Sequence, residues 1–218
     1  MKSTSVLNRA RRKSGEIVRS FFLFRLGGRL RRWRKRPPRS ADRVLIHIGC
    51  GVFNDKRYIN VDSRPGWHID HVESIENCPR VFGRDYADLI YACHVLEHVS
   101  HLEVPRTLEG LYGCLKKGGV LRLSVPDFRA ILKIYEEKHA IADIASLLLG
   151  GQEYPGNVHL SVFDEEHLTA ALRRAGFAEV RRWDPETASF HDFEDWSRRR
   201  KRLYGRDWEI SLNLEAVK

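Results

Sequence analysis

Two glycines and an acid thirteen residues later are the residues with the clearest chemical meaning in this sequence. Gly49 and Gly51 flank Cys50 directly after a short apolar run, and Asp62 ends the next such run. Glycine allows a tight turn and a close approach of a ligand to the backbone. A carboxylate at a strand end can accept hydrogen bonds from both hydroxyls of a ribose. We therefore expect these residues to bind a nucleoside.

The spacing between Gly49 and Asp62 narrows the class of ligand. A dinucleotide-binding fold places its acid about 20 residues after the glycines, behind a complete helix whose N-terminus faces a pyrophosphate. Here the separation is 13 residues, and Asn54 occupies the position of the third glycine in a GxGxxG pattern. The sequence therefore favours a ligand with a ribose but no phosphate over NAD or FAD.

Apolar runs alternate with helical patterns from residue 43 onward. Strands are predicted at residues 44–48, 58–62, 68–75, 87–93, 120–125, 178–183 and 210–217. Helices are predicted at residues 97–115, 128–137, 141–149 and 164–175. This order indicates an α/β fold with a mostly parallel sheet of seven strands and helices on both faces. Ligands bind such a sheet at the carboxyl ends of its strands.

Residues 1–40 differ in composition from the rest of the chain. They carry 14 Lys and Arg residues and one acid, whereas the remaining residues carry 24 basic and 28 acidic side chains. We therefore divide the chain into a basic amphipathic arm, residues 1–40, and a domain, residues 41–218. Residues 1–36 could contact a membrane surface or a partner, pack on the domain, or form a solvated tail. An Arg-rich start is also typical of transit peptides.

Several classes of protein are disfavoured by composition. None of the four cysteines forms a CxxC pair and no histidine cluster has zinc-like spacing, so we expect reduced thiols, a cytoplasmic protein and no metal site. No apolar run approaches the ~20 residues that span a bilayer. The mildly acidic domain argues against nucleic-acid binding by its surface.

Four ordered motifs resemble those of class I S-adenosylmethionine-dependent methyltransferases, most closely the bacterial branch with a short first crossover, called type 11-like. The motifs are residues 45–51, 58–62, 88–98 and 115–127. Residues 158–183 resemble the later helix and sixth strand of the family, whereas residues 1–40 and 188–209 have no counterpart. The resemblance implies a Rossmann-like methyltransferase fold with S-adenosyl-L-methionine as the cofactor.

The resemblance also implies roles for matching positions in cofactor binding. Gly49, Cys50 and Gly51 would lie under the methionyl part of the cofactor, and Asp62 would bind the ribose hydroxyls. The adenine would lie against the loop that follows the third strand. The residues of that loop are Glu73, which could accept from the exocyclic amine, Ser74 and Ile75.

The motif at residues 88–98 holds the positions next to the reacting atoms. The resemblance places Cys93 and His94 beside the sulfonium and the acceptor. Glu97 and His98 are predicted instead to open a helix, where an acid favours the helix dipole. His47 departs from the family pattern. Many relatives carry an acid at this position, which helps to place the amino group of the cofactor.

Transfer to a hydroxyl would require a base. We predict His94 and His159 as candidate bases, with Asp127 orienting the acceptor or serving as an alternative base. Asn157 and His159 belong to a segment rich in Gly, Pro and Asn that could line an acceptor pocket or form ordinary turns. Four tryptophans are predicted to pack rather than to recognise a ligand: Trp67, Trp183, Trp196 and Trp208.

Three functions remain open from the sequence. The first is methylation of a small-molecule or glycan-type acceptor at oxygen, by a protein that could contact the inner face of a membrane through its arm. The second is methylation of RNA or protein, with nucleic acid less favoured because the domain is acidic. The third is a scaffold that binds the cofactor without catalysis. The sequence leaves the oligomeric state open.

Overall fold

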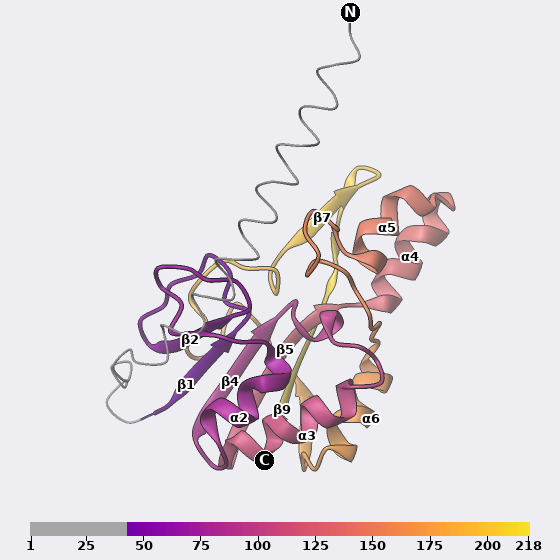
Figure 1. Ribbon diagram of the computed structural model, residues 1–218. Helices are drawn as coiled ribbons and strands as arrows, with labels where there is room; N and C mark the ends of the chain where they lie inside the picture. The colour runs from indigo at the N-terminus through magenta and orange to yellow at the C-terminus, as the bar shows by residue number, and fades with distance from the viewer. Residues whose placement is uncertain (1–42) are drawn as a thin grey trace, which may run out of the picture.

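Seven strands form one sheet in the order β3-β2-β1-β4-β5-β9-β6 (Figure 1). The computed structural model describes residues 43–218, so the predicted arm lies outside the described residues. The strands are β1 (Leu45–Ile48), β2 (Tyr58–Asp62), β3 (His71–Val72), β4 (Ala87–Cys93), β5 (Leu115–Pro126), β6 (Glu179–Arg182) and β9 (Ser211–Val217). Strand β9 runs antiparallel to β5 and β6, and the pairs from β3 to β5 are parallel. The predicted mostly parallel seven-stranded sheet is confirmed.

The central strands β1 and β4 are almost fully buried because both of their faces are covered. One face packs against α2 (Cys78–Phe82), α3 (Val104–Cys114) and α6 (Glu165–Arg174), which lie together in Figure 1. On the other face, Leu45, Tyr58 and Tyr91 pack against Trp183 and Phe193. Within residues 43–218, this second face is thus covered by the irregular segment 184–199 rather than by a helix.

The order in which strands are added to the sheet reverses at β1, although β1 and β4 are parallel. From β1 the chain builds outward through β2 to β3, and it then returns to place β4 on the other side of β1. The carboxyl ends of β1 and β4 therefore flank the crevice where ligands bind in open α/β sheets. Gly49 follows β1 and His94 follows β4 at this crevice.

The predicted helix at residues 97–115 is wrong in its first seven residues, 97–103. A short 3₁₀ turn, η3 (Leu96–His98), ends at Val99 in an extended conformation, and α3 begins only at Val104 with a proline in its first turn. Proline suits the first turn of a helix. The Glu97 carbonyl accepts from the backbone N–H groups of Leu160 and Ser161 at 2.7 and 3.1 Å, so it is not available to continue a helix.

Two further differences concern strands and a hairpin. The third strand is limited to His71–Val72, and β5 begins at Leu115 rather than at residue 120. Strands β7 (Arg200–Leu203) and β8 (Arg206–Glu209) form a separate hairpin that the sequence pattern did not predict. This hairpin packs on α4 (Phe128–Lys138) and α5 (Ile141–Leu149), and the four elements form a smaller apolar cluster beside the sheet.

Candidate functional site

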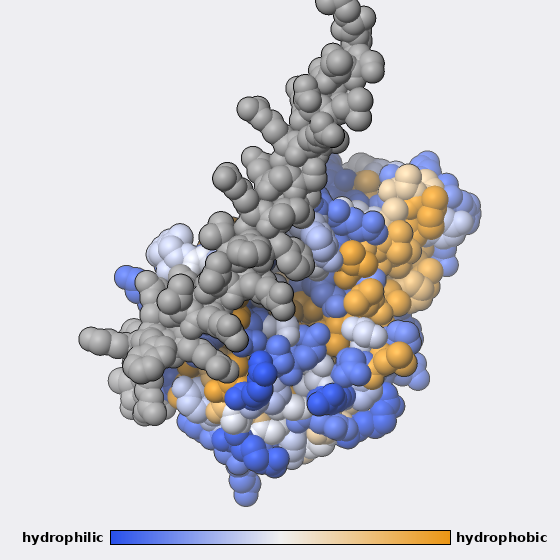
Figure 2. Space-filling model, in the orientation of Figure 1, coloured by the Kyte–Doolittle hydropathy of each residue, from blue (hydrophilic) through white to orange (hydrophobic). Residues whose placement is uncertain are grey.

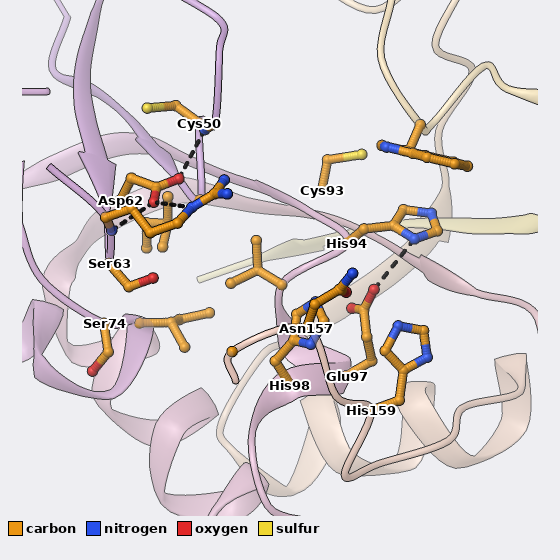
Figure 3. Close-up of a pocket in the computed structure, with 18 of the residues that line it drawn as sticks. Cys50, Asp62, Ser63, Ser74, Cys93, His94, Glu97, His98, Asn157 and His159 are labelled. Carbon is orange, nitrogen blue, oxygen red and sulfur yellow. Dashed lines mark hydrogen bonds and ion pairs between the residues drawn. The ribbon is translucent and has the colours of Figure 1, made fainter. Parts of the chain in front are cut away.

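A cavity of about 670 Å³ opens at the carboxyl ends of β1, β2 and β4 (Figure 3). This volume lies within the range of small-molecule and cofactor sites. Residues from the β1–β2 turn and the loops after β2, β3 and β4 line one part of it, and the segments 151–159 and 195–196 close another. The cavity thus coincides with the crevice that the strand order predicts.

The β1–β2 turn requires its two glycines. Gly49 has a φ of +66°, and a Cβ there would lie 2.2 Å from Cγ2 of Val95. Gly51 has a φ of +56° and a Cβ there would meet nothing within 4 Å, so the backbone at Gly51 is open to a ligand. L-residues with side chains rarely adopt these angles.

Asp62 is buried behind this turn and ends β2. Its Oδ2 accepts from the backbone N–H of Gly51 at 2.9 Å, and its Oδ1 accepts from the backbone N–H of Arg64 at 2.8 Å. Each carboxylate oxygen can accept more than one hydrogen bond. The two backbone bonds therefore fix the orientation of the carboxylate and leave acceptor capacity for two ligand hydroxyls.

The loop after β3 forms the neighbouring wall. Glu73, Ser74 and Ile75 all line the cavity, as the sequence predicted for an adenine subsite. The backbone N–H of Glu73 donates to the Asp62 carbonyl at 3.0 Å, which holds this wall beside the carboxylate.

Cys50 and Cys93 also line the cavity, but their thiols are not activated. Burial raises the pKa of Cys50 to about 12, and burial holds the pKa of Cys93 well above its usual range. The thiolate is the nucleophilic form of cysteine. These side chains therefore supply contact surface rather than a nucleophile.

His94 follows β4 with a φ of +52° and turns its ring into the cavity wall. Its Nε2 lies 2.8 Å from Oγ of Ser211, whose hydroxyl donates to the Trp196 carbonyl. Its Nδ1 lies 3.2 Å from Oε1 of Glu97. Figure 3 shows His94, Glu97, His98 and His159 grouped on one side of the cavity, across from Asp62.

Glu97 does not open a helix but lies fully buried in η3. Among the described residues, its Oε2 has no hydrogen-bond partner, and the contact of its Oε1 is Nδ1 of His94 at 3.2 Å. Burial raises the pKa of Glu97, but the nearby imidazoles of His94 and His98 outweigh burial and leave the pKa below its ordinary value. Because the 3₁₀ turn replaces the predicted helix start, this carboxylate and His98 reach the cavity.

His98 and His159 make equivalent hydrogen bonds. The Nδ1 of His98 lies 3.0 Å from the Val158 carbonyl, and the Nδ1 of His159 lies 3.0 Å from the Leu147 carbonyl. A carbonyl only accepts, so each Nδ1 carries a proton. Burial lowers the pKa of His159, which keeps its imidazole neutral with a lone pair on Nε2.

Asp127 lies outside the residues that line the cavity. It is the N-cap of α4, where its side chain accepts from the backbone N–H of Arg129 at 3.0 Å. Such a cap stabilises a helix by satisfying a free N–H. The structure thus brings His94 and His159 into the cavity but places Asp127 in a capping position.

Lining residues that were not predicted as site residues include Tyr154, Asp195 and Trp196. Trp196 lies with its ring centroid 5.6 Å from that of His94, and Tyr154 stacks with the guanidinium of Arg64 at 4.8 Å across the cavity. Their segments have no regular secondary structure. The sequence therefore offered no periodic pattern that would place them here.

Comparison with known proteins identifies the family. A family model described as a methyltransferase domain matches residues 24–181, which is more than half of the chain. The chain belongs to the class I S-adenosylmethionine-dependent methyltransferases. No curated protein matches this methyltransferase significantly in sequence.

The chain is similar to several solved structures. A SAM-dependent methyltransferase from Archaeoglobus fulgidus is 14% identical, with a TM-score of 0.52 over 81% of this chain and 86% of that chain. A SAM-dependent methyltransferase from Thermotoga maritima, described as a possible histamine N-methyltransferase, is 18% identical. Its TM-score is 0.47, and the match covers 95% of this chain and 97% of that chain.

The cavity of this methyltransferase fits its cofactor, S-adenosylmethionine. The open backbone at Gly51, the oriented carboxylate of Asp62 and the wall at 73–75 lie side by side, in the order that methionyl, ribose and adenine groups require. The β1–β2 turn leads into no helix that could face a diphosphate. These residues would hold an adenosyl group, and Cys93 and His94 would lie beyond its ribose.

His47 lies in an aromatic cluster under the cavity floor. Its ring is 4.9 Å from that of Tyr91 and 5.7 Å from that of Phe193, and its Nδ1 has no hydrogen-bond partner among residues 43–218. Burial lowers the pKa of His47 from 6.5 to about 4. A neutral, deeply buried imidazole therefore occupies the position where the resemblance led us to expect an acid.

This pKa predicts that acid destabilises the fold through His47. Above pH 6.5 the imidazole is neutral in both folded and unfolded chains. Between pH 6.5 and 4 the unfolded chain binds the proton and the folded chain does not, so the free energy of unfolding should fall by about 3 kcal/mol. Urea unfolding of His47→Phe at a series of pH values should show a flatter decline than wild type. Equal slopes in both proteins would contradict this account.

No helix within residues 43–218 has the length and apolarity needed to cross a bilayer.

Proposed function

We propose that this methyltransferase methylates a hydroxyl oxygen on a small-molecule or glycan-type acceptor. The observation that supports it is the group of proton-accepting side chains beyond Cys93, namely His94, Glu97, His98 and His159. A hydroxyl must lose its proton as it attacks, and an oriented base promotes that step. The wall opposite the adenosyl subsite carries such bases.

The residues of the chain contribute orientation and proton transfer. S-adenosylmethionine supplies an electrophilic methyl group when bound. The cavity walls, including Trp196 and Tyr154, exclude water and hold the acceptor in line with that group. His159 presents a neutral Nε2 because Nδ1 donates to Leu147, and His94 is held by Ser211, so either ring could take the hydroxyl proton.

The charge of the cavity favours an acceptor without phosphates. Arg64 is the one Lys or Arg among its lining residues in the described chain, whereas the lining acids are Asp62, Glu73, Glu76, Glu97, Glu153 and Asp195. Affinity for RNA depends on cations that contact phosphates. An uncharged acceptor such as a sugar therefore suits this cavity better than RNA does.

The acceptor can be identified with isotope-labelled S-adenosylmethionine. We expect the protein to transfer label from the cofactor to a small-molecule or glycan fraction of cell extract, in a base-stable linkage typical of an ether. Labelling confined to RNA or protein would support those acceptors instead. Cofactor binding without any labelled product would favour a non-catalytic scaffold.

Contact with a membrane surface is a further part of the proposal. Exposed apolar side chains gather around α4, α5 and the segment that follows, seen as an orange area in Figure 2. They are Leu132, Ile141, Leu149, Leu160 and Val162. The arm adds 14 Lys and Arg residues, and each basic residue near an anionic surface contributes about 1 kcal/mol of attraction.

Removal of residues 1–40 should therefore abolish sedimentation with anionic liposomes at low salt. Binding of S-adenosylhomocysteine should be unchanged, because the cofactor cavity lies within the domain. High salt should release the full-length protein. Equal sedimentation of the full-length and truncated proteins would show that the arm does not contribute to membrane binding.

A further inference from the structure

Glu97, His98 and His159 place three potential ligand atoms within 4.8 Å of one another. They come from two separate segments, since His159 lies 61 residues after His98. Backbone bonds from Leu160 and Ser161 to the Glu97 carbonyl hold these segments together. The cluster is therefore fixed by the fold, and its side chains face the same cavity.

The carboxylate of Glu97 is the first sign of a missing cation. The residue is fully buried, its Oε2 has no hydrogen-bond partner among the described residues, and the contact of its Oε1 is Nδ1 of His94 at 3.2 Å. A buried charge is costly unless it is paired or coordinates a metal. The described residues place no Lys or Arg against this carboxylate.

The two histidines of the cluster are oriented as metal-binding histidines usually are. Each donates its Nδ1 proton to a backbone carbonyl, of Val158 for His98 and of Leu147 for His159. Each Nε2 then presents a lone pair. A backbone carbonyl that fixes the tautomer in this way is the usual outer partner of a metal-ligating imidazole.

His94 adds a fourth lone pair. The Ser211 hydroxyl donates to the Trp196 carbonyl at 2.7 Å, so it accepts from Nε2 of His94. In a neutral ring, Nδ1 then carries a lone pair that points at a carboxylate oxygen 3.2 Å away. Two acceptors at this distance repel unless a cation or a proton lies with them.

We propose that Glu97, His98 and His159 bind a divalent first-row transition-metal ion such as Zn²⁺, with His94 adjacent to the ion. With the ion bound, Nε2 of His159 would be a ligand, and His94 would be the base for the hydroxyl proton. Imidazole and carboxylate ligands suit Zn²⁺, Co²⁺ and Mn²⁺, whereas Mg²⁺ and Ca²⁺ prefer all-oxygen sites. This proposal revises the expectation of no metal site. The pattern His94-x-x-Glu97-His98 was present in the sequence, but it became a site only through His159.

Three protein ligands leave coordination positions open toward the cavity. An acceptor with two oxygens on adjacent carbons, as in a sugar diol, could occupy them and present one oxygen to the methyl group. Binding of the ion does not depend on the acceptor, but this role rests on the proposed function.

The test uses full-length, tag-free protein stripped of metal by a chelator. Titration with ZnCl₂ in a calorimeter should show one saturable site per chain, and CoCl₂ should give visible d–d absorption. Glu97→Gln and His159→Ala should each weaken binding by about 100-fold or more. His101→Ala is the matched control, because this exposed histidine lies close in sequence but outside the cavity.

Binding of S-adenosylhomocysteine checks that each variant is folded. The proposal is overturned if wild type shows no saturable Zn²⁺ uptake, or if Glu97→Gln binds as tightly as wild type. If wild type takes up no Zn²⁺, a proton shared between His94 and Glu97 explains why the two side chains lie so close together. If the protein binds the metal but does not methylate oxygen, the proposed function is overturned and this inference stands. If chelator-treated protein still methylates its acceptor and takes up no metal, this inference is overturned and the proposed function stands.

Discussion

Asp62→Ala should weaken binding of S-adenosylhomocysteine by about 100-fold. The buried carboxylate accepts from the backbone N–H groups of Gly51 and Arg64 and lies 3.5 Å from Nε of Arg64, which leaves acceptor capacity for the ribose hydroxyls. Hydrogen bonds to a charged group are worth about 1.5–3 kcal/mol each, and 1.4 kcal/mol corresponds to a factor of ten in affinity. Calorimetric titration of wild type and variant measures the change directly.

Two further variants separate ribose binding from folding. Asp62→Asn keeps the size of the side chain but loses its charge, so its affinity should lie between those of wild type and Asp62→Ala. Glu109→Ala, an exposed acid on α3 outside the cavity, should bind like wild type. An Asp62→Ala protein that melts cooperatively and binds the nucleoside as well as wild type would contradict the assigned role.

The double variant His94→Ala, His159→Ala should reduce kcat by about 10²–10⁴-fold at saturating cofactor. Loss of a general base typically has this effect. These two imidazoles were predicted as bases from the sequence, and both line the cavity. Turnover is measured with the acceptor that the labelling experiment identifies. Affinity for S-adenosylhomocysteine should change little, because the ribose and adenine walls are formed by other residues.

The matched control for this variant is His101→Ala, His139→Ala. It also removes two histidines, but both are exposed and neither lines the cavity. It should retain wild-type turnover. Unchanged turnover in the His94 and His159 variant would mean that the acceptor needs no base from these residues, as for an acceptor that is already deprotonated.

The cofactor half of the site was predictable because it depends on local sequence. Gly49, Gly51 and Asp62 lie at the ends of adjacent parallel strands, and strand ends can be read from apolar runs that stop at a turn. The sheet order then brings Gly49 and Asp62 together. The prediction of a parallel sheet and the prediction of this turn therefore support each other.

The acceptor half was less predictable because it depends on loops. Glu97 reaches the cavity only because the chain leaves the helical path at Val99 and bonds to Leu160 and Ser161. Trp196 lies near His94 because the segment 184–199 folds back over the sheet. These contacts join segments far apart in the chain, and the periodicity of one sequence does not reveal them.

The most direct measurement is a crystal structure of the full chain grown with S-adenosylhomocysteine. We expect the ribose hydroxyls on the Asp62 carboxylate, the adenine beside residues 73–75, and the sulfur directed toward His94 and Glu97. A groove without the nucleoside at saturating concentration, or a nucleoside bound elsewhere, would contradict it.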